Sequence, residues 1–493
     1  MAAVGPSDVI VSARADGATQ RSASDDALTL FSALWAVASL FHVLGPSGVA
    51  TDLRAGASGV AAGQALVAIA ALVVLARPRR TAPFVVLALL GPITAWQEAP
   101  TLGNHWFVAA LVDVGLVLAL VAARRGWRVD RTALSDSFLP VARWALVGFY
   151  AFAGFAKLNS AFFDTTVSCG NVYFDETART LGLSTPLAVG HGGWASLVPV
   201  GTALVELSIP VLLCIRRTRT IGVVVGLLFH SAIAIDQEHL FSDFSSVLSA
   251  LFVLFLPAAF ATAVLDKARG RARFAIGAWW ALAALVVAAQ WLDDGGDLVD
   301  SVFVDGRMWL WFLFDGALLA AVGWWLVAAR TPPLEAPLRL DRRARWLAIV
   351  PVVVILNGFT PYLELKTAFS YNMYANLSVG EGSSNHLIVR ATLPVGSRLS
   401  GLVQVVATDD PGLAAYQQGD YLLPWDSFRA YLSAHPAAAV TYVRDGVTHT
   451  LAHAADEPGL TDAPPTLVQK LLPLRAVDGQ DPPRCQESFL PAL

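Results

Sequence analysis

Charged residues are scarce in this chain. Asp, Glu, Lys and Arg make up 15% of its 493 residues, whereas 55% are hydrophobic and the mean hydropathy is +0.57. Soluble domains usually carry about 25% charged residues. The composition therefore excludes an ordinary soluble domain and predicts an integral, multi-pass membrane protein. The small net charge of −4 gives no reason to expect a nucleic-acid partner.

Several signatures of common chemistries are missing as well. The chain has no Walker loop, no G-x-S-x-G motif and no dinucleotide-binding fingerprint. His449 and His453 have the spacing of a metal-binding pair, but they fall in a predicted strand, so we predict no metal site. No A-x-A cleavage site follows the first apolar run, so we expect no removable signal peptide.

Apolar runs of membrane-spanning length dominate the chain up to Pro361. A spanning helix needs about 20 mostly apolar residues, and we predict eleven such segments. The third is short and contains Pro92, so we expect it to be tilted, broken or partly re-entrant. The segments are Ala27–Gly45, Val60–Ala76, Ala82–Gln97, His105–Ala123, Phe138–Lys157, Ala195–Ile215, Thr220–Asp236, Phe244–Leu265, Phe274–Leu292, Met308–Ala328 and Trp346–Pro361.

Basic residues alternate between the loops that join these segments. The even-numbered loops hold 19 Lys and Arg residues, and the odd-numbered loops hold Arg54, Arg179 and Arg307. Because Lys and Arg accumulate in cytoplasmic loops, this bias places the N-terminus in the cytoplasm and the region after Pro361 outside. The basic residues of the even-numbered loops are Arg77, Arg79, Arg80, Arg124, Arg125, Arg128, Arg131, Arg216, Arg217, Arg219, Lys267, Arg269, Arg271, Arg273, Arg330, Arg339, Arg342, Arg343 and Arg345.

The region after Pro361 has a different composition and predicts a small α+β domain. A helix is expected at Pro424–Ala434, with proline at its start. Asp445-Gly446 lies between two strand-like runs and is a hairpin signal. The expected strands are Leu387–Thr392, Leu402–Thr408, Ala439–Val443 and Val447–His453.

The predicted fold is an all-α membrane bundle of about eleven helices with a small external α+β C-terminal domain. A cytoplasmic tail covers residues 1–26, the bundle covers 27–361 and the external domain covers 362–493. The long outer loop between the fifth and sixth segments contains a polar, helix-like run, Asp175–Leu183, and a turn cluster, Gly190–Gly193.

Lys157 ends the fifth apolar segment and is the first candidate functional residue. Tyr150, Ala153, Gly154 and Lys157 share one helical face, on which the two small residues allow close approach of a neighbouring helix. A lysine that points into a bundle is costly unless it snorkels, pairs or works, which makes it a functional candidate. The alternative is an anchor at the membrane surface.

The predicted topology places three histidines at a depth similar to that of Lys157. His105 starts the fourth segment, His230 lies in the outer half of the seventh, and His42 lies near the outer end of the first. Glu206 and Asp113 lie deeper. A desolvated lysine or a histidine suits proton abstraction near neutral pH. The alternative is that each histidine makes a structural bond between helices and that Glu206 only pairs with a neighbouring helix.

Several motifs around these residues resemble one family. The run Tyr150–Phe163 closes a helix with Lys157, Asn104-His105-Trp106 precedes it, and Phe229-His230 follows it. The runs Asn357–Lys366, Tyr371–Leu377 and Ser384-Asn385-His386 come at the end of the bundle. In this order, between Ala27 and His386, the motifs resemble the vitamin K-dependent γ-carboxylase-like family, whose members contain a horizontally transferred transmembrane (HTTM) domain.

The resemblance implies a chemistry. In the family, a lysine at the position matched by Lys157 is the proposed base that deprotonates a reduced, vitamin K-like quinone. The quinol then reacts with O2, a glutamate of a peptide or protein on the outer side is deprotonated, and CO2 adds to it. We accordingly predict Lys157, His105 and His230 as catalytic residues. The predicted substrate-binding residues are Asn104, Tyr150, Glu206, Asn385 and His386.

The chain also departs from the family. Its carboxylating animal members carry a second basic residue just before the lysine, where this chain has Ala156, and a much longer external region that binds a propeptide. The alternative function is therefore a non-catalytic membrane partner or maturation protein on the same scaffold. A transporter is less favoured because the chain shows no repeated halves and no paired broken helices.

The three cysteines predict one disulfide. The charge alternation places Cys169 and Cys485 outside and Cys214 at the inner end of the sixth segment. Disulfides persist outside the cell, so only Cys169 and Cys485 are candidates for a bond. Such a bond would clasp the external domain over the bundle, and a loop of this length predicts a stabilisation of about 4–5 kcal/mol. The alternative is two unrelated thiols.

Overall fold

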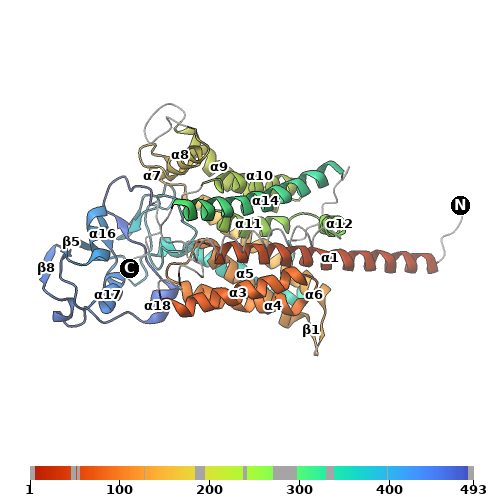
Figure 1. The fold of residues 1–493 in the computed structure, drawn as a ribbon, viewed down its shortest axis with the longest axis horizontal. Helices are drawn as coiled ribbons and strands as arrows, with labels where there is room; N and C mark the ends of the chain where they lie inside the picture. Colours follow the sequence, from red (N-terminus) through yellow and green to blue (C-terminus); the bar gives the residue numbers. More distant parts are fainter. Residues whose placement is uncertain are drawn as a thin grey trace. The chain divides into compact units, whose positions relative to one another are not determined.

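A computed structural model describes residues 6–45, 52, 56–126, 128–183, 195–236, 241–269, 297–328, 338–396 and 398–486 (Figure 1). The chain divides into two compact units. The first unit comprises residues 1–97, 108–147 and 209–352, and the second comprises residues 98–107, 148–208 and 353–493.

The first unit is helical. Its α1 (Pro6–Val43) packs against α3 (Ser58–Ala76), α11 (Ser242–Val253) and α12 (Ala258–Ala268) (Figure 1). The unit also contains α4 (Thr81–Glu98, except its last residue), α10 (Arg219–Ile233), α14 (Asp297–Ala328), the 3₁₀ helix η1 (Arg342–Ala348) and a short ribbon of β1 (Arg124–Arg125) and β2 (Arg128–Val129). Four helices contribute residues to both units, namely α5 (Asn104–Ala123), α6 (Arg131–Ala156), α9 (Leu197–Cys214) and α15 (Ile349–Phe359).

Seven helices among the described residues are long and apolar enough to cross a membrane, or eight if the bent pair α11 and α12 is one span. They are Ala23–Val43, Ser58–Ala76, Asn104–Ala123, Arg131–Ala156, Leu197–Cys214, Met308–Ala328 and Ala344–Leu363.

The predicted count of eleven spans is not confirmed. The third predicted segment forms α4, which contains Pro92 and is not among the seven. The seventh forms α10, whose 15 residues extend about 22 Å, less than the roughly 30 Å of a bilayer core. The ninth, Phe274–Leu292, lies outside the described residues.

The eighth predicted segment is two helices rather than one. α11 and α12 meet at an angle of 114°, and Pro257 stands at the N-cap of α12. Proline lacks the backbone N–H that a continuous helix would need at this point. The buried Arg143 guanidinium donates from Nε to the carbonyl of Leu254 at the break, at 2.7 Å. This bond satisfies a carbonyl that the interruption leaves without a helical partner.

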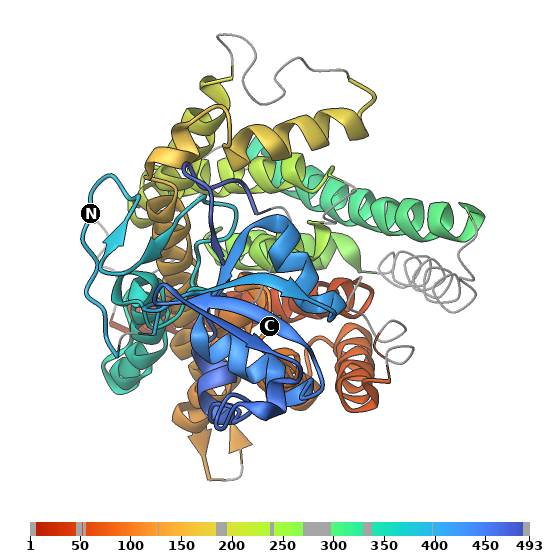
Figure 2. The same cartoon turned by 90° about the vertical axis from the view of Figure 1, so that its left-hand side faces the viewer.

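The C-terminal part of the second unit is the expected α+β domain. Its five-stranded antiparallel sheet has the order β8-β7-β5-β6-β9, and α16 and α17 belong to the same domain. The domain is drawn in blue in Figure 2. The elements are β5 (Val403–Thr408), α16 (Pro411–Gly419), β6 (Tyr421–Leu423), α17 (Trp425–Ala434), β7 (Val440–Arg444), β8 (Val447–Leu451), η3 (Ala454–Asp456), α18 (Thr466–Leu471) and β9 (Val477–Asp478).

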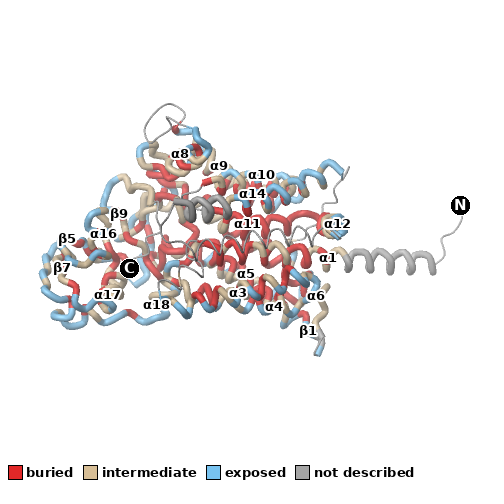
Figure 3. Tube along the Cα trace, viewed as in Figure 1, coloured by how far each residue is buried: buried red, intermediate tan, exposed pale blue. Residues whose placement is uncertain are grey.

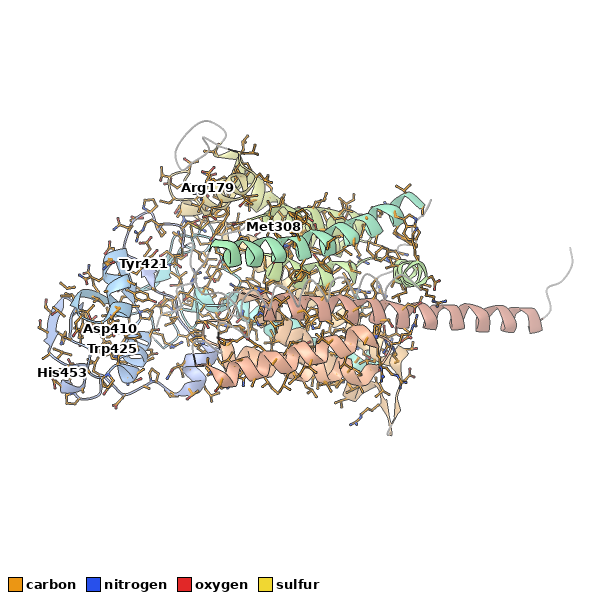
Figure 4. All side chains as sticks on the ribbon, in the orientation of Figure 1. Arg179, Met308, Asp410, Tyr421, Trp425 and His453 are labelled. Carbon is orange, nitrogen blue, oxygen red and sulfur yellow. A yellow bond between two sulfur atoms is a disulfide. The ribbon has the colours of Figure 1, made fainter. Side chains whose placement is uncertain are left out.

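An apolar core holds this domain together. Phe428 and Leu432 of α17 pack with Tyr442 of β7 and Val403 of β5, all of them almost fully buried. Figure 3 shows the buried stretches of the chain in red. The alternation of buried and exposed residues along β5 is that of a half-buried strand. Asp410, labelled in Figure 4, accepts a hydrogen bond from the Leu413 N–H as the N-cap of α16.

Most local predictions for this domain are confirmed. The hairpin β7–β8 turns at Asp445-Gly446, both with positive φ (51° and 76°), as a two-residue hairpin turn requires. Helix α17 starts directly after Pro424. The predicted strand Leu387–Thr392 is wrong. Apart from an isolated bridge at Ala391, this run has no strand, because part of its backbone bonds to side chains, with His386 accepting from the N–H groups of Ile388 and Val389.

The remaining elements of the second unit precede the sheet. They are α7 (Ser160–Phe163), α8 (Cys169–Thr180), η2 (Thr360–Leu363) and the two-residue strands β3 (Val379–Gly380) and β4 (Ser383–Ser384). The run predicted as helical at Asp175–Leu183 is helical only up to Thr180, where it forms the second half of α8, which begins at Cys169. The predicted turn cluster at Gly190–Gly193 lies outside the described residues.

Candidate functional site

The second unit contains a buried ion pair at the end of α6. Lys157 Nζ lies 2.8 Å from Glu206 Oε2 of α9, and both side chains are about nine-tenths buried. The ammonium group also lies 5.8 Å from the centre of the Phe162 ring. Tyr150, seven residues before Lys157 in the chain, interacts electrostatically with Glu206. A paired lysine inside the protein fits a functional position better than a surface anchor.

A close approach of α6 and α9 makes this pair possible. A Cβ added at Gly154 would lie 3.1 Å from the backbone nitrogen of Leu207 and 3.0 Å from its Cδ2. Leu207 follows Glu206 directly, so the absence of a side chain at Gly154 sets how closely Glu206 approaches Lys157. The sequence-based expectation that small residues of α6 admit a neighbouring helix is confirmed at this position.

We expect the substitution Gly154→Ala to destabilise the protein by about 1–3 kcal/mol, the usual range for overpacking. The added methyl group forces α9 away by a few tenths of an ångström. Gly201→Ala in the same helix α9 is the matched control, since a Cβ there meets no atom within 4 Å. Thermal unfolding of the purified variants measures the difference. Equal midpoints for the two variants would contradict the packing argument.

Side chains from the segment after α15 hold the turn that carries Lys157. The Asn159 amide nitrogen donates to the carbonyls of Ala156 (2.8 Å) and Ala375 (2.5 Å). Its oxygen accepts from the Phe162 N–H at 2.8 Å as the N-cap of α7. Asn385 donates to the Asn159 oxygen at 3.3 Å. The bond to Ala156 satisfies a carbonyl in the last turn of α6, and the other bonds tie the turn to segments distant in the sequence. Together they fix the position of Lys157.

His386 also holds the end of α6, and its hydrogen bonds determine which tautomer it adopts. Its Nε2 lies 2.9 Å from the Phe155 carbonyl, so this nitrogen carries the proton. Its Nδ1 accepts from the N–H groups of Ile388 (3.1 Å) and Val389 (3.0 Å). Burial lowers the pKa of His386, although the bond to Phe155 opposes the shift. The structure thus gives Asn385 and His386, which we predicted to bind substrate, a role in positioning the end of α6.

The lowered pKa of His386 predicts that stability falls in mild acid. Its contribution is fully present above the unfolded-state pKa of about 6.5 and is lost as the pH falls through the folded-state pKa. We expect the unfolding midpoint of the wild type to drop more steeply between pH 7 and pH 5 than that of His386→Gln, which cannot titrate. Parallel slopes for the two proteins would contradict this assignment.

Asn104 and His105 lie against a different segment of the second unit. Asn104 Oδ1 accepts from the Tyr371 N–H at 2.6 Å, and the buried His105 ring folds back over Gly103. Asn104 therefore anchors the segment around Tyr371. The three motifs Asn104-His105, Asn357–Lys366 and Tyr371–Leu377 come together here, although they are far apart in the sequence.

A second buried lysine at this place was not singled out from the sequence. Lys366 Nζ donates to Asn357 Oδ1 at 2.6 Å and lies 3.7 Å and 4.0 Å from the ring centres of Phe369 and Phe107. In the part of the chain that the structure describes, it makes no ion pair with a carboxylate. Burial lowers the pKa of Lys366 well below its ordinary value. Its position in a motif was the available signal, but its burial depends on contacts distant in the sequence.

The other predicted titratable residues apart from Glu206 belong to the first unit. His230 is buried, with Nδ1 3.2 Å from Ser245 Oγ and its ring 5.0 Å from that of Phe244. His42 Nδ1 lies 3.3 Å from Asp243 Oδ2. The indole of Trp35 donates to Asp113 at 2.9 Å. These contacts match the alternative that we gave for the histidines, bonds between helices.

The predicted disulfide is confirmed. Cys169 and Cys485 are bonded, with their Cα atoms 4.8 Å apart and a sequence separation of 316. The third cysteine, Cys214, is free and exposed. The bond joins the start of α8 to the C-terminal segment, and Cys485 packs against the cluster formed by Phe162, Cys169 and Ala203.

Neither possible metal ligands nor comparisons with known proteins identify the site further. Among the described residues, no three His, Cys, Asp or Glu side chains gather in a way that could hold a metal ion. No protein-family model, no curated protein and no solved structure matches the chain. The functional interpretation therefore rests on the residues and on the geometry of the Lys157–Glu206 pair.

Proposed function

We propose that this protein is an integral membrane enzyme of the vitamin K-dependent γ-carboxylase type, which oxidises a quinol with Lys157 as the base. The observation that carries the proposal is the buried Lys157–Glu206 pair, built where α6 and α9 approach at Gly154. A base buried at the end of an apolar helix suits a substrate that arrives from lipid. His105 and His230 remain proposed catalytic residues on the strength of the motif order.

Glu206 gives Lys157 a partner with which it exchanges a proton. When the ammonium proton moves to Glu206, Nζ of Lys157 is free to accept the proton of a quinol hydroxyl. The Phe162 ring 5.8 Å away stabilises the ammonium ion that results.

The bound quinol supplies the reducing power, and its oxidation by O2 provides the base needed to deprotonate a glutamate before CO2 adds. The residues of this chain have narrower tasks in the proposal. Asn159, Asn385 and His386 hold the end of α6, so that Lys157 keeps one position. Tyr150 lies in the same helix, α6, and orients the substrate beside Glu206. A base that is already held in one position loses little conformational entropy when the transition state is reached.

The proposal includes the topology. We place the N-terminus in the cytoplasm and the C-terminal α+β domain outside. The Cys169–Cys485 bond supports this placement, because disulfides persist in oxidising compartments. The free Cys214 belongs to the other side in this topology.

The test of function is oxygen consumption by the purified protein when a vitamin K-like hydroquinone is added. We expect quinol-dependent uptake of O2 and formation of the quinone epoxide, both above the rate of quinol autoxidation in empty micelles. Addition of a glutamate-containing peptide and labelled CO2 then tests the coupled carboxylation. No quinol-dependent uptake would contradict the proposal.

One observation favours the second candidate, a non-catalytic partner or maturation protein. The side chains of Asn104, Asn385 and His386, all predicted to bind substrate, make hydrogen bonds that hold backbone segments together. On this alternative, the Lys157–Glu206 pair is structural. Quinol turnover that needs Lys157 distinguishes the two candidates.

A further inference from the structure

The second unit contains a small polar pocket that the proposed quinol chemistry does not use. Its volume is about 40 Å³, and it lies between the segment 372–379 and the C-terminal segment 475–486, beside Cys169. A buried water needs roughly 10–15 Å³, so the pocket holds only about three or four water-sized groups. The polar side chains that line it are Asn372, Asn376, Arg475, Asp478, Arg484 and Gln486.

The wall of this pocket has an unusual backbone. Tyr374 and Asn376, which line it, and Tyr371, just before it, have φ values of 54°, 51° and 62° without being glycine. Such left-handed residues are costly and persist only where their surroundings hold them, commonly at binding sites. Both polar atoms of the Asn376 side chain are bonded. Its oxygen accepts from the Cys169 N–H at 2.8 Å, and its nitrogen donates to the Val167 carbonyl at 2.9 Å.

The charged side chains of the lining carry a net positive charge. Asp478 accepts four hydrogen bonds from Arg484, of which the shortest are 2.6 Å from Nη2 and 2.6 Å from the backbone N–H. These two charges cancel. Arg475, whose guanidinium donates to the side-chain oxygen of Gln486, adds one further positive charge. A guanidinium presents paired N–H donors that match the geometry of a carboxylate.

Asn372 gives separate evidence that the pocket takes a ligand. It lines the pocket and is 4% exposed. Its side-chain oxygen has no hydrogen-bond partner among the described residues. Buried amide groups are normally satisfied, and each exception needs an explanation such as a bound ligand. The neighbouring Asn376 shows the contrast, because its amide is fully used by the protein.

We propose that this pocket binds a carboxylate with an N–H group beside it, as in an N-acyl amino acid or the C-terminal residue of a peptide. Arg475 and the Asn372 amide nitrogen donate to the carboxylate, and the Asn372 oxygen accepts from the ligand N–H. The small volume admits the carboxylate and its α-carbon, so a ligand with a glycine-like end fits best. This binding requires neither Lys157 nor a quinol.

The test uses the full-length protein in detergent micelles and titration calorimetry. N-acetylglycine is the probe, and its methyl ester and acetate are the matched controls. We expect N-acetylglycine to bind at least tenfold more tightly than the ester, which lacks the charge, and than acetate, which lacks the N–H. The peptide acetyl-Ala-Ala-Gly and its C-terminal amide show whether the ligand is the end of a peptide or a small N-acyl amino acid. Binding of the peptide acid but not of the amide indicates a peptide end, and binding of N-acetylglycine alone indicates a small molecule.

Variants of the lining test the assignment of residues. Arg475→Gln and Asn372→Leu should each weaken N-acetylglycine binding at least tenfold, whereas Arg429→Gln, outside the pocket, should leave it unchanged. Asn372→Leu removes an amide oxygen that has no partner among the described residues, so its thermal midpoint should not fall. If that variant does not fold, Asn372→Asp replaces it in the test, because its carboxylate repels the carboxylate of N-acetylglycine. No binding by the wild type, or equal binding by wild type, Arg475→Gln and the Asn372 variant, overturns the proposal.

Discussion

Substitution of Lys157 by alanine should abolish quinol oxidation. A positioned base contributes about 100- to 10,000-fold to a rate, so we expect a loss of at least about 100-fold. Lys157→Arg should be equally inactive, because arginine stays protonated and cannot accept the quinol proton. The rate of quinol-dependent O2 uptake by the purified variants measures the effect. Activity near the wild-type level in Lys157→Ala would exclude the lysine as the base.

Folding must be separated from catalysis in this test. Removal of one partner of a buried ion pair leaves an unpaired charge and costs about 3–5 kcal/mol. Lys157→Met alone should therefore lower the unfolding midpoint, because Glu206 stays buried opposite it. The double variant Lys157→Met/Glu206→Leu should regain the stability and stay inactive. A double variant that regains activity would show that the pair serves only packing.

Loss of the disulfide should have the largest effect on stability. The bond closes a loop of 316 residues, and loops longer than about 100 residues gain close to 5 kcal/mol in the chain-entropy model. We therefore expect Cys169→Ser/Cys485→Ser to lower the free energy of unfolding by up to about 5 kcal/mol. Thermal unfolding in detergent and protease cleavage within residues 478–486 report the change.

Cys214 provides the matched control for this prediction. It is exposed and free, so Cys214→Ser should leave both the unfolding midpoint and the protease pattern unchanged. Reducing agent should reproduce the effect of the double substitution in the wild type and should have no effect on the double variant. Equal midpoints for the wild type and the double variant would show that the bond adds no net stability.

The features that the sequence predicted well are local or compositional. Apolar runs predicted the long helices, Asp445-Gly446 predicted the hairpin, and the compartment argument predicted the pairing of Cys169 with Cys485. Gly154 marked the helix contact correctly because small residues admit a close neighbour. Each of these predictions depends on a few adjacent residues or on a general rule, such as the compartment in which disulfides persist.

The features that it missed depend on contacts between distant segments. The interruption of the predicted segment Phe244–Leu265 before Pro257 depends on a carbonyl that Arg143 satisfies from another helix. The burial of Lys366 depends on Phe107, more than 250 residues earlier in the chain. The left-handed residues Tyr374 and Asn376 are not glycines, so no turn signal marks the pocket that they line.

The most direct measurement of the central claim is the deprotonation of a quinol in the absence of oxygen. Anaerobic mixing of excess purified protein with a vitamin K-like hydroquinone allows the quinolate anion to be followed by its ultraviolet absorbance. We predict that wild-type protein forms quinolate in proportion to its concentration, and that Lys157→Ala and Lys157→Arg form none. Quinolate in equal amounts with the wild type and with Lys157→Ala, or none with the wild type, would contradict the assignment of Lys157 as the base.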